Sequence, residues 1–110
     1  MVIDMVGLHE DIEDGFRKAS EKNKLVLLHF TAEWCGACKI QEKILEQEVI
    51  PLLKNEVVFI KINVDSYEDM IAEYNVQSIP LLILLSVDKR EKWRKAGISV
   101  REEIEKAIAF

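Results

Sequence analysis

The sequence predicts an α/β protein with a central mixed β-sheet and helices on both of its faces. Short apolar, β-branched segments typical of buried strands alternate with segments whose apolar residues recur at helical spacing. Strands joined through helices pair in parallel, whereas the short turn near Asp88 requires an antiparallel pair. With 110 residues, 49% of them hydrophobic, the chain has the size and apolar content of one domain, residues 1–110.

The first half of the chain is expected to contain two helices and two strands. Val2–Val6 reads as a short strand, and the helix from Glu10 to Lys22 places Ile12, Phe16 and Ala19 on one face. Leu25–Phe30 has the apolar run of a buried strand. From Ala37 onward, Ile40, Ile44 and Leu45 recur at helical spacing, and Pro51 and Asn55 mark a break after that helix.

The second half is expected to contain three strands and two helices. Val57–Val64 has the composition of a central strand buried on both faces. Asp65 or Ser66 can cap the next helix, whose apolar stripe is best explained as core and consists of Tyr67, Met70, Ile71 and Tyr74. Leu81–Leu85 follows Pro80, and a turn at Asp88-Lys89 leads into the strand Glu91–Ala96. Gly97 ends that strand, and a capping box of Ser99 and Glu102 starts the last helix, which bears Val100, Ile104, Ala107 and Ile108.

Charge and hydropathy exclude two classes of partner. The net charge is −5 and the pI about 5.1, and no basic stripe interleaved with aromatic residues occurs, so nucleic acid is not expected as a partner. The longest apolar run, Ile79 to Leu85, is too short to cross a membrane. The N-terminal segment lacks a basic leader and a long apolar stretch, so we expect a cytoplasmic protein. Basic residues around the last hairpin strand are interpreted as protection of a sheet edge, with recognition of an acidic partner as the alternative; they are Lys89, Arg90, Lys92, Arg94 and Lys95.

Both cysteines lie in the segment Trp34-Cys35-Gly36-Ala37-Cys38, between a predicted strand and a predicted helix. A helix N-terminus favours a thiolate over a thiol, and the thiolate attacks disulfides. Cys38 is one helical turn further on, within reach of Cys35, so one cysteine attacks and the other resolves the mixed disulfide. The alternatives are an inert buried pair or half of a metal site. A zinc site needs three or four protein ligands, and only His9, His29 and carboxylates remain, so no metal and no cofactor are expected.

Four segments in order resemble the thioredoxin family over nearly the whole chain. They are residues 32–39 around the dithiol, Lys61–Asp65 as the central strand, Val76–Pro80 as the loop with the family's cis-proline, and Gly97 after the last hairpin strand. The resemblance implies the thioredoxin fold, with Pro80 cis and beside the Cys35 sulfur. It also implies that Trp34, Ile79 and Gly97 form an apolar surface on which partner proteins dock.

The residues expected to tune the dithiol are Gly36, Ala37, His29 and Lys61. Ala37 stands where the family usually has proline, and His29 where it has a buried aspartate. His29 can act as a neutral base for Cys38, or in its protonated form can stabilise a nearby thiolate. Either role opposes a thiolate less than a carboxylate does, so we predict a couple less reducing than that of a typical thioredoxin. Lys61 either reaches solvent or pairs with a charge near the active site.

Together these features predict a monomeric thiol–disulfide oxidoreductase that reduces disulfides in partner proteins through Cys35 and Cys38. A separate disulfide reductase would return the electrons. Two alternatives stay open at this point: an oxidase or isomerase of protein disulfides, and a binding module whose association is switched by the dithiol.

Overall fold

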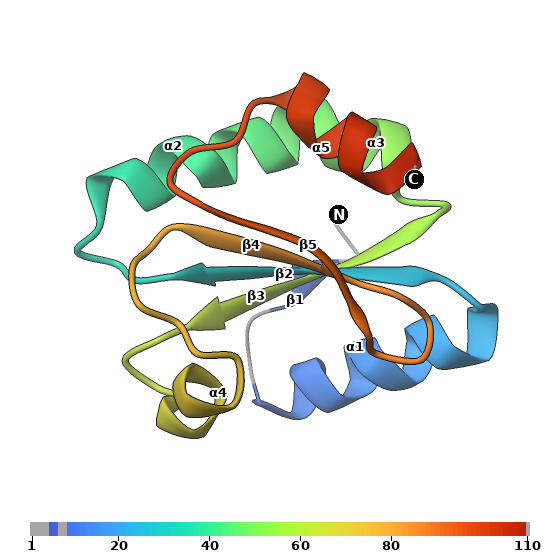
Figure 1. Ribbon diagram of the computed structural model, residues 1–110, viewed down its shortest axis with the longest axis horizontal. Coiled ribbons are helices and arrows are strands. Elements are labelled where there is room, and N and C mark those ends of the chain that lie inside the picture. Colours follow the sequence, from blue (N-terminus) through green and yellow to red (C-terminus); the bar gives the residue numbers. More distant parts are fainter. Residues whose placement is uncertain (1–4, 7–8, 110) are drawn as a thin grey trace.

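A mixed β-sheet crosses the middle of the protein, with helices above and below it (Figure 1). The computed structural model describes residues 5–6 and 9–109, and within these residues five strands form one sheet in the order β1-β3-β2-β4-β5. The first three of these run parallel, whereas β4 is antiparallel to β2 and β5 to β4. The strands are β1 (Met5–Val6), β2 (Leu25–Thr31), β3 (Val57–Asn63), β4 (Leu81–Leu85) and β5 (Glu91–Ala96). The predicted fold class is confirmed.

The helices divide into two layers, one on each face of the sheet (Figure 1). Helices α1 (His9–Lys22) and α4 (Glu68–Glu73) lie below the sheet as drawn. The upper layer contains α2 (Gly36–Ile44), which continues through a π-helical turn η1 (Leu45–Val49) into α3 (Ile50–Leu53), and also α5 (Arg101–Ala109). The expected strand over Val2–Val6 is observed at Met5–Val6, and its residues 2–4 lie outside the described residues.

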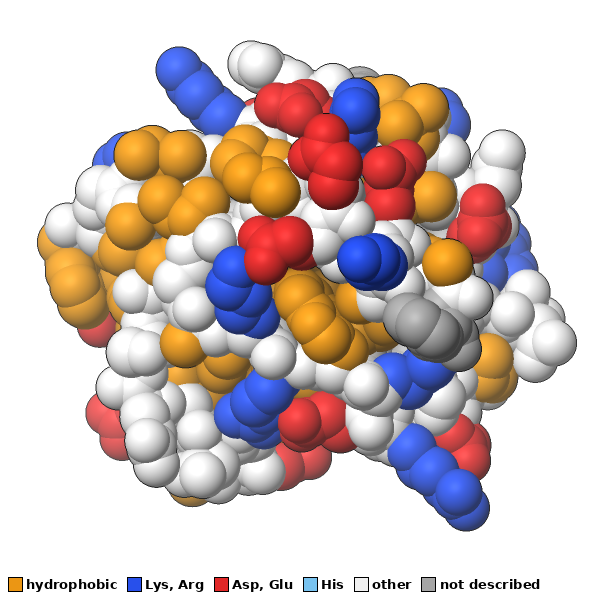
Figure 2. All heavy atoms as spheres, turned by 45° about the horizontal axis from the view of Figure 1, so that its top comes forward, with side chains coloured by type: hydrophobic (Ala, Val, Ile, Leu, Met, Phe, Trp, Pro, Cys, Tyr) orange, Lys and Arg blue, Asp and Glu red, His pale blue; other side chains and the backbone are white. Residues whose placement is uncertain are grey.

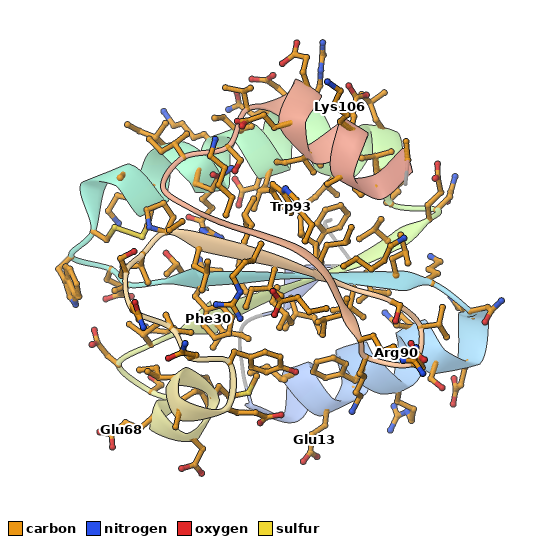
Figure 3. The ribbon with its side chains drawn as sticks, in the orientation of Figure 1. Glu13, Phe30, Glu68, Arg90, Trp93 and Lys106 are labelled. Carbon is orange, nitrogen blue, oxygen red and sulfur yellow. A yellow bond between two sulfur atoms is a disulfide. The ribbon has the colours of Figure 1, made fainter. Side chains whose placement is uncertain are left out.

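Alternation along the strands produces two separate apolar clusters, because successive side chains point to opposite faces of a sheet. Leu28 and Phe30 of β2 pack toward α1 and α4, whereas Leu27 packs toward α2 and α5. Figure 3 shows Phe30 below the sheet and Trp93 of β5 above it. All five residues of β4 are buried, which explains its uninterrupted apolar sequence.

The helix after the dithiol differs from its sequence prediction in two ways. Ile40 is 53% exposed, and the buried position on that turn belongs to Gln41. Pro51 does not break the helix, because it lies in the first turn of α3, where its missing N–H is not needed for an intrahelical hydrogen bond. The helical path therefore ends at Leu53, and the break falls at Lys54–Glu56.

Both predicted helix caps are wrong in position. The N-cap of α4 is Tyr67, which makes no side-chain capping hydrogen bond, while Asp65 and Ser66 form the preceding turn. At α5, Glu103 accepts a hydrogen bond from the Val100 N–H (3.1 Å), one residue later than the expected pairing of Ser99 with Glu102. Ser99 is instead fully buried, and its N–H donates to the Gln41 side chain. The predicted apolar stripe of α4 is half-buried. Its residues Tyr67, Met70 and Tyr74 pack against the apolar cluster below the sheet.

Candidate active site

The two cysteines lie at the start of α2, where the chain leaves the end of β2, and they form a disulfide with Cα atoms 5.2 Å apart. Cys35 is the N-cap residue, and its Sγ accepts a hydrogen bond from the Cys38 N–H (3.1 Å). Cys35 is 8% exposed and Cys38 only 1%. The predicted helix N-terminus is confirmed, and the exposures distinguish an outer sulfur from an inner one.

A tight turn places Cys35 at this position. β2 ends at Thr31, and the Cys35 N–H donates to the carbonyl of Ala32 (3.2 Å), which turns the chain directly into α2. Ala32 and the two cysteines form a small buried cluster, against which Val64 and Ile79 pack. Ile79, predicted from the resemblance to belong to the site, therefore does lie against the dithiol.

The Ile79–Pro80 peptide bond is cis, as the resemblance implied. The carbonyl of Pro80 accepts a hydrogen bond from the N–H of Gly97 (2.8 Å), which joins two of the predicted substrate-binding residues. Gly97 has a φ of +88°, a conformation that side-chain-bearing residues rarely adopt, and it is exposed. Trp34 is 70% exposed, and its Nε1 donates to Asp65 Oδ2 (2.8 Å), so the indole is held at the surface by the loop after β3.

His29 of β2 is 2% exposed, with no hydrogen-bond partner for either ring nitrogen among the described residues. Burial lowers the pKa of His29 to about 4, with nearby Glu42 opposing this effect and Lys61 adding to it. His29 is therefore neutral at neutral pH. This charge state is that of the oxidised protein, and of the two roles predicted for His29 it favours the neutral base.

Lys61 pairs with a charge, as one of its two predicted interpretations required. Its Nζ forms a salt bridge with Glu42 of α2, a residue that the sequence analysis did not single out. Glu42 is four residues after Cys38 and on the same face of the helix, and this spacing is the signal that could have identified it. Gly36 and Ala37 are exposed, and a Cβ at Gly36 would meet no atom within 4 Å.

A second residue missed by the sequence analysis is Gln41, three residues after Cys38. It is fully buried and exchanges two hydrogen bonds with the backbone of Ser99, through its Nε2 and Oε1 atoms. Helical spacing puts position 41 on one face with Cys38 and Leu45, and an amide on that face was the available signal, because a buried amide needs hydrogen-bond partners.

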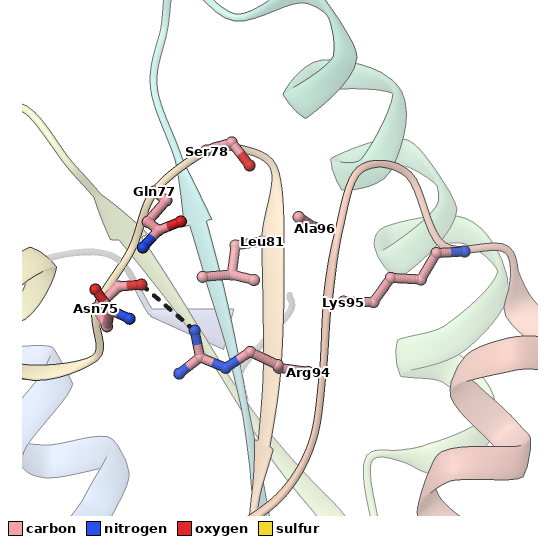
Figure 4. Close-up of a pocket in the computed structure, with 7 residues that line it drawn as sticks. All are labelled: Asn75, Gln77, Ser78, Leu81, Arg94, Lys95 and Ala96. Carbon is pink, nitrogen blue, oxygen red and sulfur yellow. Dashed lines mark hydrogen bonds between the residues drawn. The ribbon is translucent and has the colours of Figure 1, made fainter.

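A pocket of about 230 Å³, lined mostly by residues of polar type, opens between the loop before Pro80 and the edge strand β5 (Figure 4). Ser78 and Leu81, which bracket the cis bond in sequence, contribute to its lining; Asn75, Gln77, Arg94, Lys95 and Ala96 complete it. Arg94 is held by Glu91 and donates to the carbonyls of Tyr74 and Asn75. The predicted basic cluster does lie along the edge strand, with Arg94 and Lys95 engaged in salt bridges.

Acidic and basic side chains are interspersed, with apolar ones between them, on the face drawn in Figure 2. Within the part of the chain that the structure describes, no group of three or more His, Cys, Asp or Glu side chains could hold a metal ion. In the same residues, no helix is long and apolar enough to cross a membrane.

Comparisons with known proteins agree with this geometry. A family model described as Thioredoxin matches residues 8–109. Thioredoxin H-type 1 of Nicotiana tabacum is 33% identical over 99 residues, which cover 90% of this chain and 75% of the relative. Thioredoxin 1 of Chlorobaculum tepidum is 38% identical over 87 residues, or 76% of this chain and 84% of the relative. The crystal structure of the thioredoxin NaTrxh from Nicotiana alata superposes with a TM-score of 0.81 at 29% identity, covering 99% of this chain and 93% of that one.

Proposed function

Since the chain belongs to the thioredoxin family and is a thiol–disulfide oxidoreductase, we propose that it works in the reducing direction, with Cys35 attacking and Cys38 resolving. Family membership implies protein disulfides as substrates and a reductase as electron donor. The observation that carries the assignment of roles is the asymmetry of the two sulfurs: Cys35 is the more exposed and lies at the N-cap of α2, whereas Cys38 is buried.

The first step is attack by the Cys35 thiolate on one sulfur of a substrate disulfide. The Cys38 N–H, which points at Cys35 Sγ, and the N-terminus of α2 both stabilise this thiolate. A bond forms between Cys35 and the attacked sulfur, and the second substrate sulfur leaves as a thiolate that takes up a proton.

The second step releases the substrate. Cys38 loses its proton and attacks the Cys35 sulfur, so that the Cys35–Cys38 bond forms and the mixed disulfide breaks. The substrate has then gained two electrons and two protons, and the enzyme dithiol has been oxidised to its disulfide. We assign to neutral His29 a modest contribution as base for Cys38, because a base with a pKa of about 4 takes up a proton only weakly at neutral pH.

Substrate docking is assigned to Trp34, Ile79, Pro80 and Gly97. Trp34 and Gly97 are exposed, Gly97 is hydrogen-bonded to Pro80, and Ile79 packs against the cysteines themselves. An extended substrate segment alongside Ile79 would run past the pocket, which can accept one of its side chains. We further propose that the protein acts as a monomer in the cytoplasm, where reductases keep dithiols reduced, without nucleic-acid or membrane partners.

Two variants test the assignment of roles. Cys35→Ser is expected to lose all turnover with a protein disulfide, whereas Cys38→Ser should accumulate mixed disulfides with its partners, visible on non-reducing gels. Turnover retained by Cys35→Ser would overturn the mechanism, and mixed disulfides trapped by Cys35→Ser instead of Cys38→Ser would reverse the two roles.

The direction of net electron flow is tested by the reduction potential of the couple, measured by tryptophan fluorescence in buffers of defined thiol and disulfide content. A potential below the cytosolic glutathione poise supports the reductase, and one near that of known oxidants would overturn it in favour of an oxidase. The same measurement on His29→Asp tests the tuning role of His29. We expect this variant to be more reducing, because a carboxylate opposes the thiolates of the reduced form, and an unchanged potential would contradict that role.

A further inference from the structure

Gln41 connects the helix of the dithiol with the loop before α5. Its Nε2 donates to the carbonyl of Ser99 (3.0 Å), and the Ser99 N–H donates to Gln41 Oε1 (2.6 Å). Both residues are 0% exposed, although they are 58 positions apart in sequence. Ser99 lies between β5 and α5, where neither a sheet nor a helix pairs its backbone, so this pairing depends on a side chain.

The hydrogen bonds between Gln41 and Ser99 also connect α2 with the predicted docking surface. Gln41 lies one turn after Cys38 on the same face of α2, and Ser99 is two residues after Gly97. The Gly97 N–H in turn donates to the carbonyl of Pro80 in the cis-proline loop. A continuous series of covalent links and hydrogen bonds therefore runs from the dithiol helix through Gln41 and Ser99 to Gly97 and Pro80.

An apolar residue at position 41 would fill the same space but could not form the two hydrogen bonds to the Ser99 backbone. A leucine there leaves the N–H and carbonyl of Ser99 buried and unpaired, and unpaired buried backbone groups drive a loop to shift until water or another group satisfies them. The loop that would shift includes Gly97, which is exposed and has a positive φ. Gln41 itself is buried and contacts no substrate.

We propose that Gln41 is a positioning residue that holds the Gly97 segment in place for extended polypeptide substrates, and so favours peptide disulfides over small ones. The inference rests on the proposed function, because it requires substrates to dock on Gly97 and Ile79. A small disulfide needs only the Cys35 sulfur, which Gln41 does not touch, whereas an extended peptide also needs the docking surface.

The test uses two substrates with the same leaving group: hydroxyethyl disulfide, and an extended peptide whose single cysteine is disulfide-linked to mercaptoethanol. The second-order rate constant for oxidation of the fully reduced protein is followed by tryptophan fluorescence. The ratio of the two rate constants isolates docking, because the thiolate reactivity of Cys35 cancels. In Gln41→Leu we expect the peptide rate to fall about tenfold, which corresponds to about 1.4 kcal/mol, with the small-disulfide rate within about twofold of the parent protein.

Ser99→Ala is the matched control, since it removes the side chain of Ser99 and keeps the two backbone groups that Gln41 binds. In Ser99→Ala the ratio of the peptide rate constant to the small-disulfide rate constant should equal that of the parent protein. Gln41→Glu supplies a second measurement if Gln41→Leu does not fold. The ionised carboxylate cannot donate to the Ser99 carbonyl, whereas the protonated acid can both donate and accept. Its peptide preference should therefore be low at alkaline pH and recover as the pH falls.

Two results would overturn the proposal: an unchanged ratio of the two rate constants in Gln41→Leu, whether or not both rates fall, or a ratio in Gln41→Glu that does not depend on pH. Ile79→Asp separates this failure from that of the proposed docking surface. If Ile79→Asp lowers the peptide rate and the Gln41 variants do not, only the role of Gln41 is wrong. If Ile79→Asp also leaves the peptide rate unchanged, the docking surface itself is wrong.

Discussion

The buried His29, whose ring finds no hydrogen-bond partner in the described part of the chain, should make the oxidised protein lose stability in mildly acidic solution. The pKa of His29 is about 4 in the folded protein, against 6.5 for an unperturbed histidine, and burial is the main cause. Below pH 6.5 the unfolded chain binds a proton at this residue that the folded protein does not bind. The stability is therefore complete above pH 6.5 and is lost progressively as the pH falls toward 4.

The size of the effect follows from the two pKa values. Each unit between them is worth 1.36 kcal/mol, so the whole interval from 6.5 to about 4 corresponds to about 3 kcal/mol, of which about 2 kcal/mol is lost between pH 7 and pH 5. That is a large part of the 5–15 kcal/mol that stabilises an ordinary domain. No reduction for solvent screening is needed, because the ring is only 2% exposed.

The assay is urea unfolding of the oxidised protein at a series of pH values, in parallel with His29→Leu. Carboxylates titrate in both proteins. The difference between the two proteins in how the free energy of unfolding changes with pH is therefore due to His29. The parent protein should lose about 2 kcal/mol more than the variant between pH 7 and pH 5. Because the comparison uses the change with pH, any difference in packing cancels. Equal slopes in the two proteins would refute the reasoning, since His29 would then be protonated in the folded state as easily as in the unfolded one.

Two further experiments probe the surroundings of the site. Within residues 5–6 and 9–109 the buried Ser99 hydroxyl has no hydrogen-bond partner, so Ser99→Ala should leave the free energy of unfolding unchanged or raise it by up to about 1 kcal/mol. A loss of about 1 kcal/mol would instead support the predicted capping role of Ser99. In proton NMR titrations, Glu42→Gln should lower the pKa of His29 further and Lys61→Met should raise it, because the two charges act on the ring in opposite directions. Shifts of the same sign in both variants would contradict this arrangement.

Local and periodic features of the sequence were sufficient for the strands and for the dithiol. β2, β4 and β5 lie where their apolar runs and turn residues placed them, and Cys35 caps α2 as expected from its place between a strand and a helix. These features depend on neighbouring residues and on side-chain periodicity, which a sequence displays directly.

Predictions that depended on which residue a distant element contacts were less successful. Helical spacing made Ile40 a candidate core residue, but Gln41 is buried there because the backbone of Ser99 provides partners for its amide. The Ser99 cap failed for the same reason, since that residue's backbone is bound by α2. Sequence spacing left His29 with two possible charge states, and only its burial in β2, between β3 and β4, favours the neutral one in the oxidised protein.

The sequence by itself therefore determined the α/β architecture, the reactive pair Cys35 and Cys38, and the family to which the chain is similar. The tertiary structure alone decided the charge of His29, the Glu42–Lys61 salt bridge and the link from Gln41 to Ser99. The physical reason is the separation along the chain between the residues that interact. Strand and helix patterns arise from steric and hydrophobic rules that act within a few residues, whereas desolvation, ion pairing and the pairing of buried polar groups depend on residues brought together by folding.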